Sequence, residues 1–202
     1  MSRLIALAML LALAACSVPT VPDFTYYRLP RPQPLDALDA PLFKVPAVVD
    51  AFNADGLYGD QALIYAVDAG AQQLRQYHYQ LWTDPPTRSL QRRLIEQLRE
   101  AKLSAQVTDE LPASQPAVHI SGIILRLDRV PQDTGFRAVV GLKLRADGPD
   151  GTPLLDEYYR ADKPAAGNDV KSTVDAYGAA VDEVFAKFYA DLRVRARGQH
   201  AG

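Results

Sequence analysis

Cys16 is the residue whose surroundings in the sequence indicate a definite chemical reaction. It follows one arginine, an apolar run from Leu4 to Leu13 and two alanines. The apolar run is too short to span a bilayer, which takes about 20 residues, and it has the length of the central region of an export signal. Residues 1–15 are therefore predicted to be a signal peptide, cut immediately before the cysteine.

The segment Leu13-Ala14-Ala15-Cys16 resembles the bacterial lipobox, in which the thiol becomes acylated. Cys16 is the only cysteine of the sequence, so no intramolecular disulfide can form even in an oxidising compartment. The alternative is a buried core cysteine or an ordinary neighbour of a cleavage site. Multiple acyl chains would hold the mature chain permanently, whereas one chain alone binds a membrane only marginally. Ser17 favours the periplasmic face of the outer membrane over the inner membrane, since enteric-type retention uses an aspartate there.

The remaining reactive residue types form no recognisable catalytic or metal-binding pattern. Three histidines stand alone, without partners at metal-ligand spacing: His78, His119 and His200. Two adjacent carboxylate pairs are either solvated or point to opposite faces of a strand. They are Asp109 with Glu110 and Asp156 with Glu157. No Gly-rich phosphate loop and no Gly-x-Ser-x-Gly motif occurs, so we predict no enzymatic activity, no metal site and no cofactor.

The composition is that of an ordinary globular domain, with 48% hydrophobic residues, 23% charged residues and a formal net charge of −2. A short group of basic residues near the C-terminus, Arg193, Arg195 and Arg197, follows a predicted helix end, where cations favour the helix dipole. No basic run with interleaved aromatic residues is present, so we predict no nucleic-acid partner.

The first part of the mature chain is rich in proline. Prolines between Pro19 and Pro46 favour extended backbone and predict a tether that leads into a short aromatic strand at Phe24 to Leu29. Pro46 also interrupts the apolar stretch from Leu42 to Phe52, which is typical of an edge or irregular strand.

A hairpin and an amphipathic helix come next. The strands span Ala62 to Val67 and Gln73 to Trp82, joined by a turn with Asp and Gly. Alternation along the second strand predicts that its tyrosines lie on the buried face. Asp84 is predicted to cap a helix over 85–101, with proline at the first helical position. Apolar residues recur on one side of this helix, at Leu90, Leu94, Leu98 and Ala101.

The second half of the chain contains the clearest strands. A short strand is expected over Ser104 to Val107, and a longer one over Val118 to Arg129 with a bulge near Gly122 to Ile124. Strict alternation over Phe136 to Ala146, followed by a Gly-rich turn and Leu154 to Arg160, completes an antiparallel meander. A final helix over 169–193 is long enough to cross the sheet. Its apolar side carries Val170, Val174, Tyr177, Val181, Val184, Phe185, Phe188 and Leu192.

These elements predict an α+β fold with a two-layer single domain, a mostly antiparallel sheet and two main helices packed on it. The organisation is a signal peptide (1–15), a lipidated N-terminus and tether (16–23), the α+β domain (24–197) and a flexible tail (198–202).

Several segments of this layout resemble the ABC-type transport auxiliary lipoprotein family, which includes the C component of the paraquat-inducible Pqi system. The resemblance rests on an early Tyr-Tyr-Arg-Leu strand at Tyr26 to Leu29, a tyrosine-rich strand that ends in Trp82, and a Pro-Pro helix start. It singles out Tyr77, Trp82 and Pro86 as fold-defining or partner-binding positions. For Trp82, core packing and direct lipid contact remain the two alternatives.

The resemblance implies an accessory role in lipid transport across the periplasm. The expected partner is a substrate-binding protein of the mammalian-cell-entry type, working with an ATPase and a permease, while the lipid anchor binds the membrane. Binding of lipid by the domain itself, and a homo-oligomer, stay open. The alternative function is a structural or assembly lipoprotein of the outer membrane that binds a β-barrel, a secretion channel or the cell wall.

Overall fold

The long strands of the molecule form an antiparallel meander. β7 (Val118–Pro131) pairs along nearly its whole length with β8 (Phe136–Asp147), and β8 pairs with β9 (Pro153–Pro164). The computed structural model describes residues 21–112 and 114–199, and it confirms the predicted meander. The register of β7 against β8 shifts between Ile124 and Arg126, next to the predicted bulge.

The other edge of β7 is shared by three short strands that run parallel to it. They are β2 (Ala47–Val49), β3 (Asn53–Ala54) and β4 (Ala62–Ala66), and a short 3₁₀ helix, η1 (Gly56–Gly59), lies between the last two. Beyond them, β6 (Val107–Thr108) pairs with β2, and β5 (Leu74–Trp82) joins β4 to β1 (Thr25–Tyr27). One sheet therefore holds all the described strands.

The sheet is mixed, so the expectation of a mostly antiparallel sheet is inexact. Among the described strands, five of the eight pairings are parallel, although the longest ladders are antiparallel. Turn residues indicate pairing between consecutive strands, as in the confirmed hairpin of β4 and β5. The parallel pairs join strands that are distant along the chain, and no local signal marks them. The predicted α+β class is confirmed.

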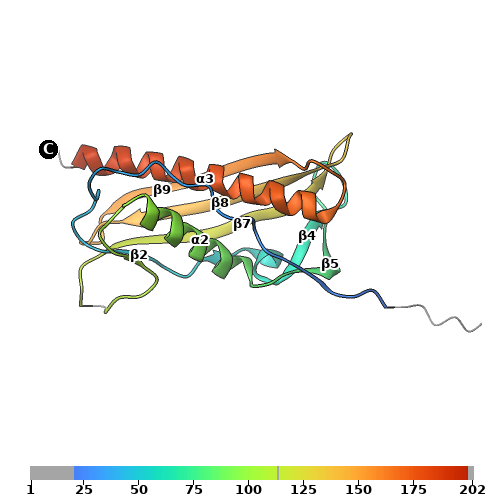
Figure 1. Ribbon diagram of the computed structural model, residues 1–202, viewed down its shortest axis with the longest axis horizontal. Coiled ribbons are helices and arrows are strands. Elements are labelled where there is room, and N and C mark those ends of the chain that lie inside the picture. The colour runs from blue at the N-terminus through green and yellow to red at the C-terminus, as the bar shows by residue number, and fades with distance from the viewer. Residues whose placement is uncertain (1–20, 113, 200–202) are drawn as a thin grey trace, which may run out of the picture.

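Two helices, α2 (Pro86–Glu100) and α3 (Val170–Gln199), pack against the sheet (Figure 1). Leu90, Leu94 and Leu98 of α2 are buried, as the spacing predicts. The apolar side of α3 faces the same core, where burying each large side chain contributes about 1.5–3 kcal/mol. The helices and the sheet thus form the expected layers.

The start of α2 differs from the prediction. Pro85 occupies the capping position without a side-chain hydrogen bond, and the helix begins at Pro86. The carboxylate of Asp84, which we expected to cap the helix, instead accepts a hydrogen bond of 2.6 Å from Arg92 Nη2. Pro86 has no N–H group, so the first turn of the helix has one fewer unpaired donor.

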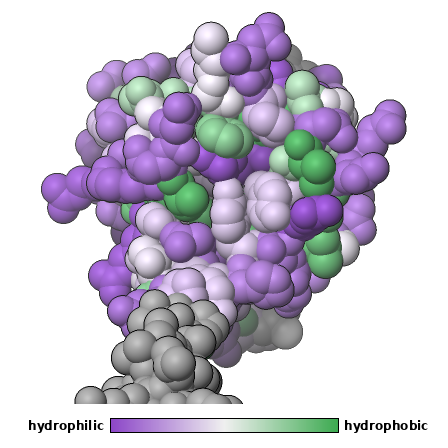
Figure 2. Space-filling view, turned by 90° about the vertical axis from the view of Figure 1, so that its right-hand side faces the viewer, coloured by the Kyte–Doolittle hydropathy of each residue, from purple (hydrophilic) through white to green (hydrophobic). Residues whose placement is uncertain are grey.

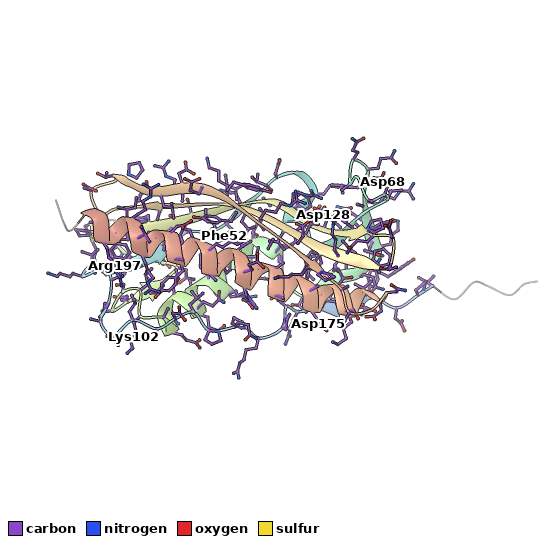
Figure 3. The ribbon with its side chains drawn as sticks, turned by 90° about the horizontal axis from the view of Figure 1, so that it is seen from above. Phe52, Asp68, Lys102, Asp128, Asp175 and Arg197 are labelled. Atoms are coloured by element: carbon purple, nitrogen blue, oxygen red, sulfur yellow. The ribbon has the colours of Figure 1, made fainter. Side chains whose placement is uncertain are left out.

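The end of α3 also differs, because the helix continues from the predicted end at 193 to Gln199. Leu192 and Ala196 are buried, so the apolar side of the helix extends past the predicted boundary. The C-terminal arginines therefore lie within the last turns of this helix. Asp175 and Arg197 mark the opposite ends of α3 in Figure 3.

Residues 29–43, here called the strap, lie on the helices. The hydroxyl of Tyr189 on α3 donates to the Asp36 carbonyl at 2.9 Å, and Leu38 N donates to the Ala101 carbonyl at 3.1 Å. A Cβ atom on Gly178 would stand 2.3 Å from Pro30 Cγ, so only glycine lets the strap approach α3 this closely. The prolines keep the strap extended but do not hold it away from the domain.

A buried carboxylate, Asp182 of α3, fastens the strap and both helices together. Its two oxygens accept hydrogen bonds from Arg93 Nε at 2.9 Å and Arg93 Nη2 at 2.8 Å. The same carboxylate accepts from Gln97 Nε2 at 2.9 Å and from the backbone N–H of Gln33 at 3.1 Å. Arg93 Nη1 also donates to the Pro30 carbonyl. All three segments meet at one charge pair.

We expect Asp182→Asn to lower the free energy of unfolding by about 3–5 kcal/mol, because it leaves the Arg93 guanidinium buried without its counter-ion. Urea denaturation measures this loss. Asp175→Asn is the matched control on the same helix, since Asp175 is exposed and, among the described residues, pairs only with Lys171; its loss should stay below about 1 kcal/mol. Equal losses in the two variants would contradict the role assigned to Asp182.

Candidate functional site

The tyrosine-rich strand β5 departs from a regular ladder in its middle. Ala62 of β4 pairs with Leu81 of β5, and Ile64 pairs with Gln76. Between these two pairs the chain moves two positions along β4 but five positions along β5. The additional residues of β5 form a bulge, here called the β5 bulge, at Tyr77 to Tyr79. Bulges re-aim side chains, and strict alternation fails here: Tyr77 and Tyr79 are half-buried as expected, but Gln76 and Gln80 are half-buried as well.

The β5 bulge forms one wall of an open pocket of about 450 Å³, here called the aromatic pocket. The other wall is the start of α3, from Asp169 to Lys171. Four tyrosines contribute to its lining: Tyr27, Tyr65, Tyr77 and Tyr79. The rings of Tyr65 and Tyr77 lie 4.5 Å apart, within the range of favourable aromatic pairs.

The aromatic pocket lies at the end of the molecule where the described chain begins (Figure 1). Figure 3 places Asp68, in the turn between β4 and β5, at the same end of the molecule. Figure 2 looks at this end and shows hydrophobic patches separated by hydrophilic surface. This end combines apolar and polar groups that face outward.

Arg129 of β7 is a buried cation beneath the aromatic pocket, with 6% of its surface exposed. Its guanidinium donates to Thr173 Oγ1 at 3.0 Å, to the Tyr77 hydroxyl at 2.8 Å and to the Asn168 carbonyl. It also stacks on the Phe136 ring, with its central carbon 3.2 Å from the ring centre. Among the described residues no carboxylate forms an ion pair with it, so Tyr77 is one of the neutral groups that hold a buried charge.

Two groups of the pocket, the Tyr27 hydroxyl and the Asp169 carboxylate, each keep one protonation state at neutral pH. Burial, with a further contribution from Asp169, raises the pKa of Tyr27, whose hydroxyl donates to Gln80 Oε1 at 2.6 Å. Asp169 accepts hydrogen bonds from the backbone and side chain of Ser172, which lower its pKa. At neutral pH Tyr27 therefore stays protonated and Asp169 stays charged. The pocket offers aromatic faces and hydrogen-bonding groups.

The structure separates the residues that the sequence singled out. Tyr77 lines the aromatic pocket and contacts Arg129. Trp82 is buried at the end of β5, with its ring centre 5.6 Å from that of Tyr177, and Pro86 is buried at the start of α2. Cys16 and the predicted signal peptide lie outside the described residues.

Sequence reasoning missed the two buried arginines, Arg93 and Arg129. Arg93 lies next to Leu94 on the apolar side of its helix, and Arg129 follows Asp128 in a strand whose flanking residues, Leu127 and Val130, are apolar. A charge in such a stretch is a signal for a buried polar contact. Its partners come from distant parts of the chain, so the sequence could not have named them.

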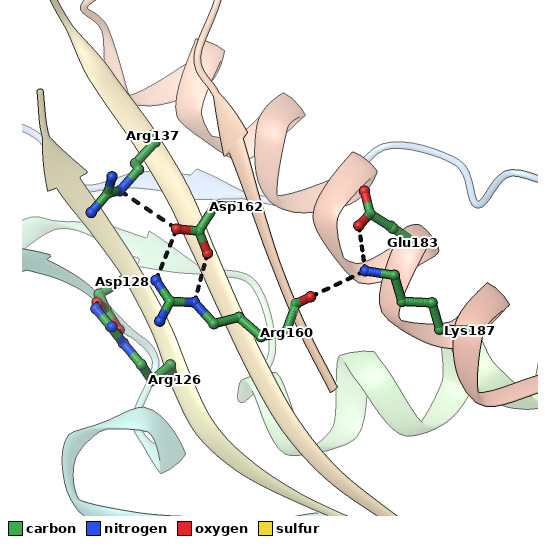
Figure 4. A network of polar contacts seen from close by, with 7 residues as sticks. All are labelled: Arg126, Asp128, Arg137, Arg160, Asp162, Glu183 and Lys187. Carbon is green, nitrogen blue, oxygen red and sulfur yellow. Dashed lines mark hydrogen bonds and ion pairs between the residues drawn. The ribbon is translucent and has the colours of Figure 1, made fainter. Parts of the chain in front are cut away.

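The remaining polar residues form structural contacts. On the outer face of the meander, Arg126 pairs with Asp128, and Asp162 contacts Arg160 at 2.8 Å and Arg137 at 3.7 Å (Figure 4). Asp128 is fully buried and also accepts a hydrogen bond of 2.8 Å from the Tyr58 hydroxyl. Burial, followed by this bond, raises the pKa of Tyr58.

The histidines of the described chain lie in strands, as expected. His78 is exposed on the β5 bulge, and His119 Nδ1 lies 3.3 Å from Asp50 Oδ1 on the surface. Within residues 21–112 and 114–199, no group of three or more potential ligand residues is placed to hold a metal ion. No helix in the same ranges combines the length and the apolar character needed to cross a bilayer.

We expect Tyr77→Phe to destabilise the fold by about 1–3 kcal/mol, because a buried guanidinium N–H loses its acceptor. Chemical denaturation measures the effect. Tyr79→Phe is the control from the same bulge, since its hydroxyl has no hydrogen-bond partner among the described residues; its effect should stay within about 0.5 kcal/mol. A Tyr77 variant as stable as the Tyr79 variant would show that the bulge and Arg129 are not coupled.

Solved structures share this fold. A protein of family DUF330 from Xanthomonas campestris is 14% identical, with a TM-score of 0.73, and the match covers 88% of this chain and 100% of that one. An uncharacterised protein at 12% identity has a TM-score of 0.66, with 85% and 99% covered. A hypothetical protein from Chlamydia trachomatis, at 11% identity, reaches 0.52, with 76% and 98% covered. At these identities the likeness concerns the fold alone.

No curated protein sequence is significantly similar to the chain. One family model does match it, over residues 60–187, a range that begins just before β4 and ends within α3. The range includes the β5 bulge, Arg129 and Asp182, which together shape the pocket and fasten the helices. The chain belongs to the family of ABC-type transport auxiliary lipoprotein components.

Proposed function

We propose that this protein is an accessory lipoprotein of an ABC-type lipid-transport system of the mammalian-cell-entry class. Residues 1–15 direct export and are removed, Cys16 is acylated, residues 16–23 form the tether, and the domain over 24–197 works in the periplasm. The observation that carries the proposal is the family match over most of the folded domain. The apolar run and small residues before Cys16 support it independently.

The proposed role is binding rather than catalysis. The sequence contains no phosphate-binding loop, so the energy for transport must come from an ATPase partner. The aromatic pocket has the mixture of aromatic and hydrogen-bonding groups that binding surfaces use. The proposed partner is the mammalian-cell-entry type substrate-binding protein.

The proposed location is the periplasmic face of the outer membrane. Ser17 follows the acylated cysteine and is compatible with transfer to that membrane in enteric-type bacteria. The described chain begins at one end of the domain, which leaves the rest of the surface free to face the periplasm (Figure 1).

We expect Cys16→Ala to abolish incorporation of radiolabelled palmitate and to move the protein from the membrane fraction to the soluble fraction, because the thiol is the proposed site of acylation. Ser17→Ala is the control, since it leaves the thiol in place and should retain both label and membrane association. Palmitate incorporation that persists without Cys16 would contradict the anchor.

We expect mild crosslinking of the full chain in cells, followed by affinity purification and mass spectrometry, to recover a mammalian-cell-entry protein. The same experiment with Cys16→Ala controls for contacts made only by random collision, since displacement from the membrane should reduce the recovery. Recovery of a β-barrel, secretion-channel or cell-wall component in its place would favour a structural or assembly role.

A further inference from the structure

The outward side of β1 exposes large aromatic side chains. Phe24 and Tyr26 are each 57% exposed, and Arg28 is exposed as well. Because side chains alternate along an extended chain, these three residues point to the same side. Phe24 is supported from within by Tyr79, whose ring centre lies 5.4 Å away. Val21, 74% exposed, precedes them. Exposed aromatic residues in a row mark a contact surface.

This surface lies close to the proposed anchor. Cys16 precedes Phe24 by eight residues, so their Cα atoms are at most about 29 Å apart even in a fully extended chain. This short spacer keeps β1 near the bilayer that holds an acylated cysteine and allows it to reach the lipid headgroups. Tyrosine and other aromatic rings with one apolar and one polar side favour this interfacial region.

Several arginines lie near the C-terminal end of β1. Arg92 hydrogen-bonds to Asp84 at 2.6 Å, and Arg88 lies one turn before Arg92 in α2, on the same side of the helix. Arg28 lines the same depression as Asp84, and the charges of Arg88 and Arg28 add to the hydrogen bond from Arg92 in lowering the pKa of that carboxylate. A depression of about 420 Å³ next to Asp84 is lined by Arg28, Arg31 and Arg92, with Glu96 as a second carboxylate. Among the described residues, neither Arg28 nor Arg88 forms an ion pair of its own. The local charge is positive.

We infer that this end of the domain docks on the bilayer that holds the anchor, through a docking face made of Phe24, Tyr26, Arg28 and Arg88. The aromatic rings enter the interfacial region, and the arginines face the phosphates of anionic phospholipids. Each basic residue near an anionic surface adds attraction, while the aromatic side chains add apolar contact. The inference rests on the proposed lipid anchor, and it assigns the domain a fixed orientation on the membrane.

The test uses full-length acylated protein in vesicles of phosphatidylethanolamine and phosphatidylglycerol, with brominated acyl chains that quench nearby tryptophan. Phe24→Trp places a probe on the docking face, and Val194→Trp places one at a site 70% exposed, about 36 Å along α3 from Val170. The signal of the buried Trp82 is subtracted using the native chain. We expect the brominated lipids to quench the tryptophan fluorescence at position 24 about twofold or more. The chain with tryptophan at position 194 should be quenched no more than the native chain.

A second comparison tests the charges. Arg28→Gln with Arg88→Gln, in the Phe24→Trp chain, should lower the quenching, whereas Arg195→Gln with Arg197→Gln at the far end of α3 should not. The inference would be overturned if quenching at position 24 were equal to quenching at position 194. It would also be overturned if quenching at position 24 were unchanged after loss of the two docking-face arginines. The inference would also be overturned if a protein bound to this face in cells and kept it away from the lipid.

Flotation of the native chain with the vesicles tests the anchor separately, so failure of the anchor and failure of docking give different results.

Discussion

Asp182 is the buried group on which the arrangement of the helices depends. A carboxylate removed from water is stable only when cations and N–H donors surround it, and here the donors come from α2 and from the strap. The strap can approach because Gly178 leaves room for Pro30 on α3. Apolar packing places both helices on the sheet, and the bidentate charge pair further fixes their position relative to each other. The start of the folded chain is fixed by the same contacts.

The central strand β7 has a comparable role within the sheet. One of its edges supports the long meander, and the other supports short parallel strands that come from the first third of the chain. Arg129, near the end of β7, then connects this sheet to the start of α3 and to Tyr77 of the β5 bulge. The aromatic pocket is therefore built on a buried cation, and the position of its tyrosines depends on the packing of α3 against the sheet.

The functional features gather at one end of the molecule. The described chain begins there, the β5 bulge opens the aromatic pocket there, and the exposed aromatic side chains of β1 lie beside arginines. The opposite end carries the last turns of α3. For a protein of a transport auxiliary lipoprotein family, this polarity separates a surface close to the proposed anchor from surfaces that face away from it. The proposed orientation of the domain on the membrane follows from the end at which the chain enters the fold.

The sequence by itself determined the features that depend on local chemistry. Alternation identified the strands of the meander, four-residue spacing identified α2, and the turn residues identified the hairpin of β4 and β5. The position of Cys16 after an apolar run predicted the anchor, which lies outside the described residues. Tyr77 and Trp82 were singled out by resemblance, but their surroundings were not known. Only the tertiary structure decided the parallel pairings, the strap, the β5 bulge and the partners of Arg93 and Arg129. The physical reason is that periodicity and turn chemistry act between near neighbours, whereas a buried charge and a parallel strand are satisfied by groups that the chain brings together only when the whole domain has folded.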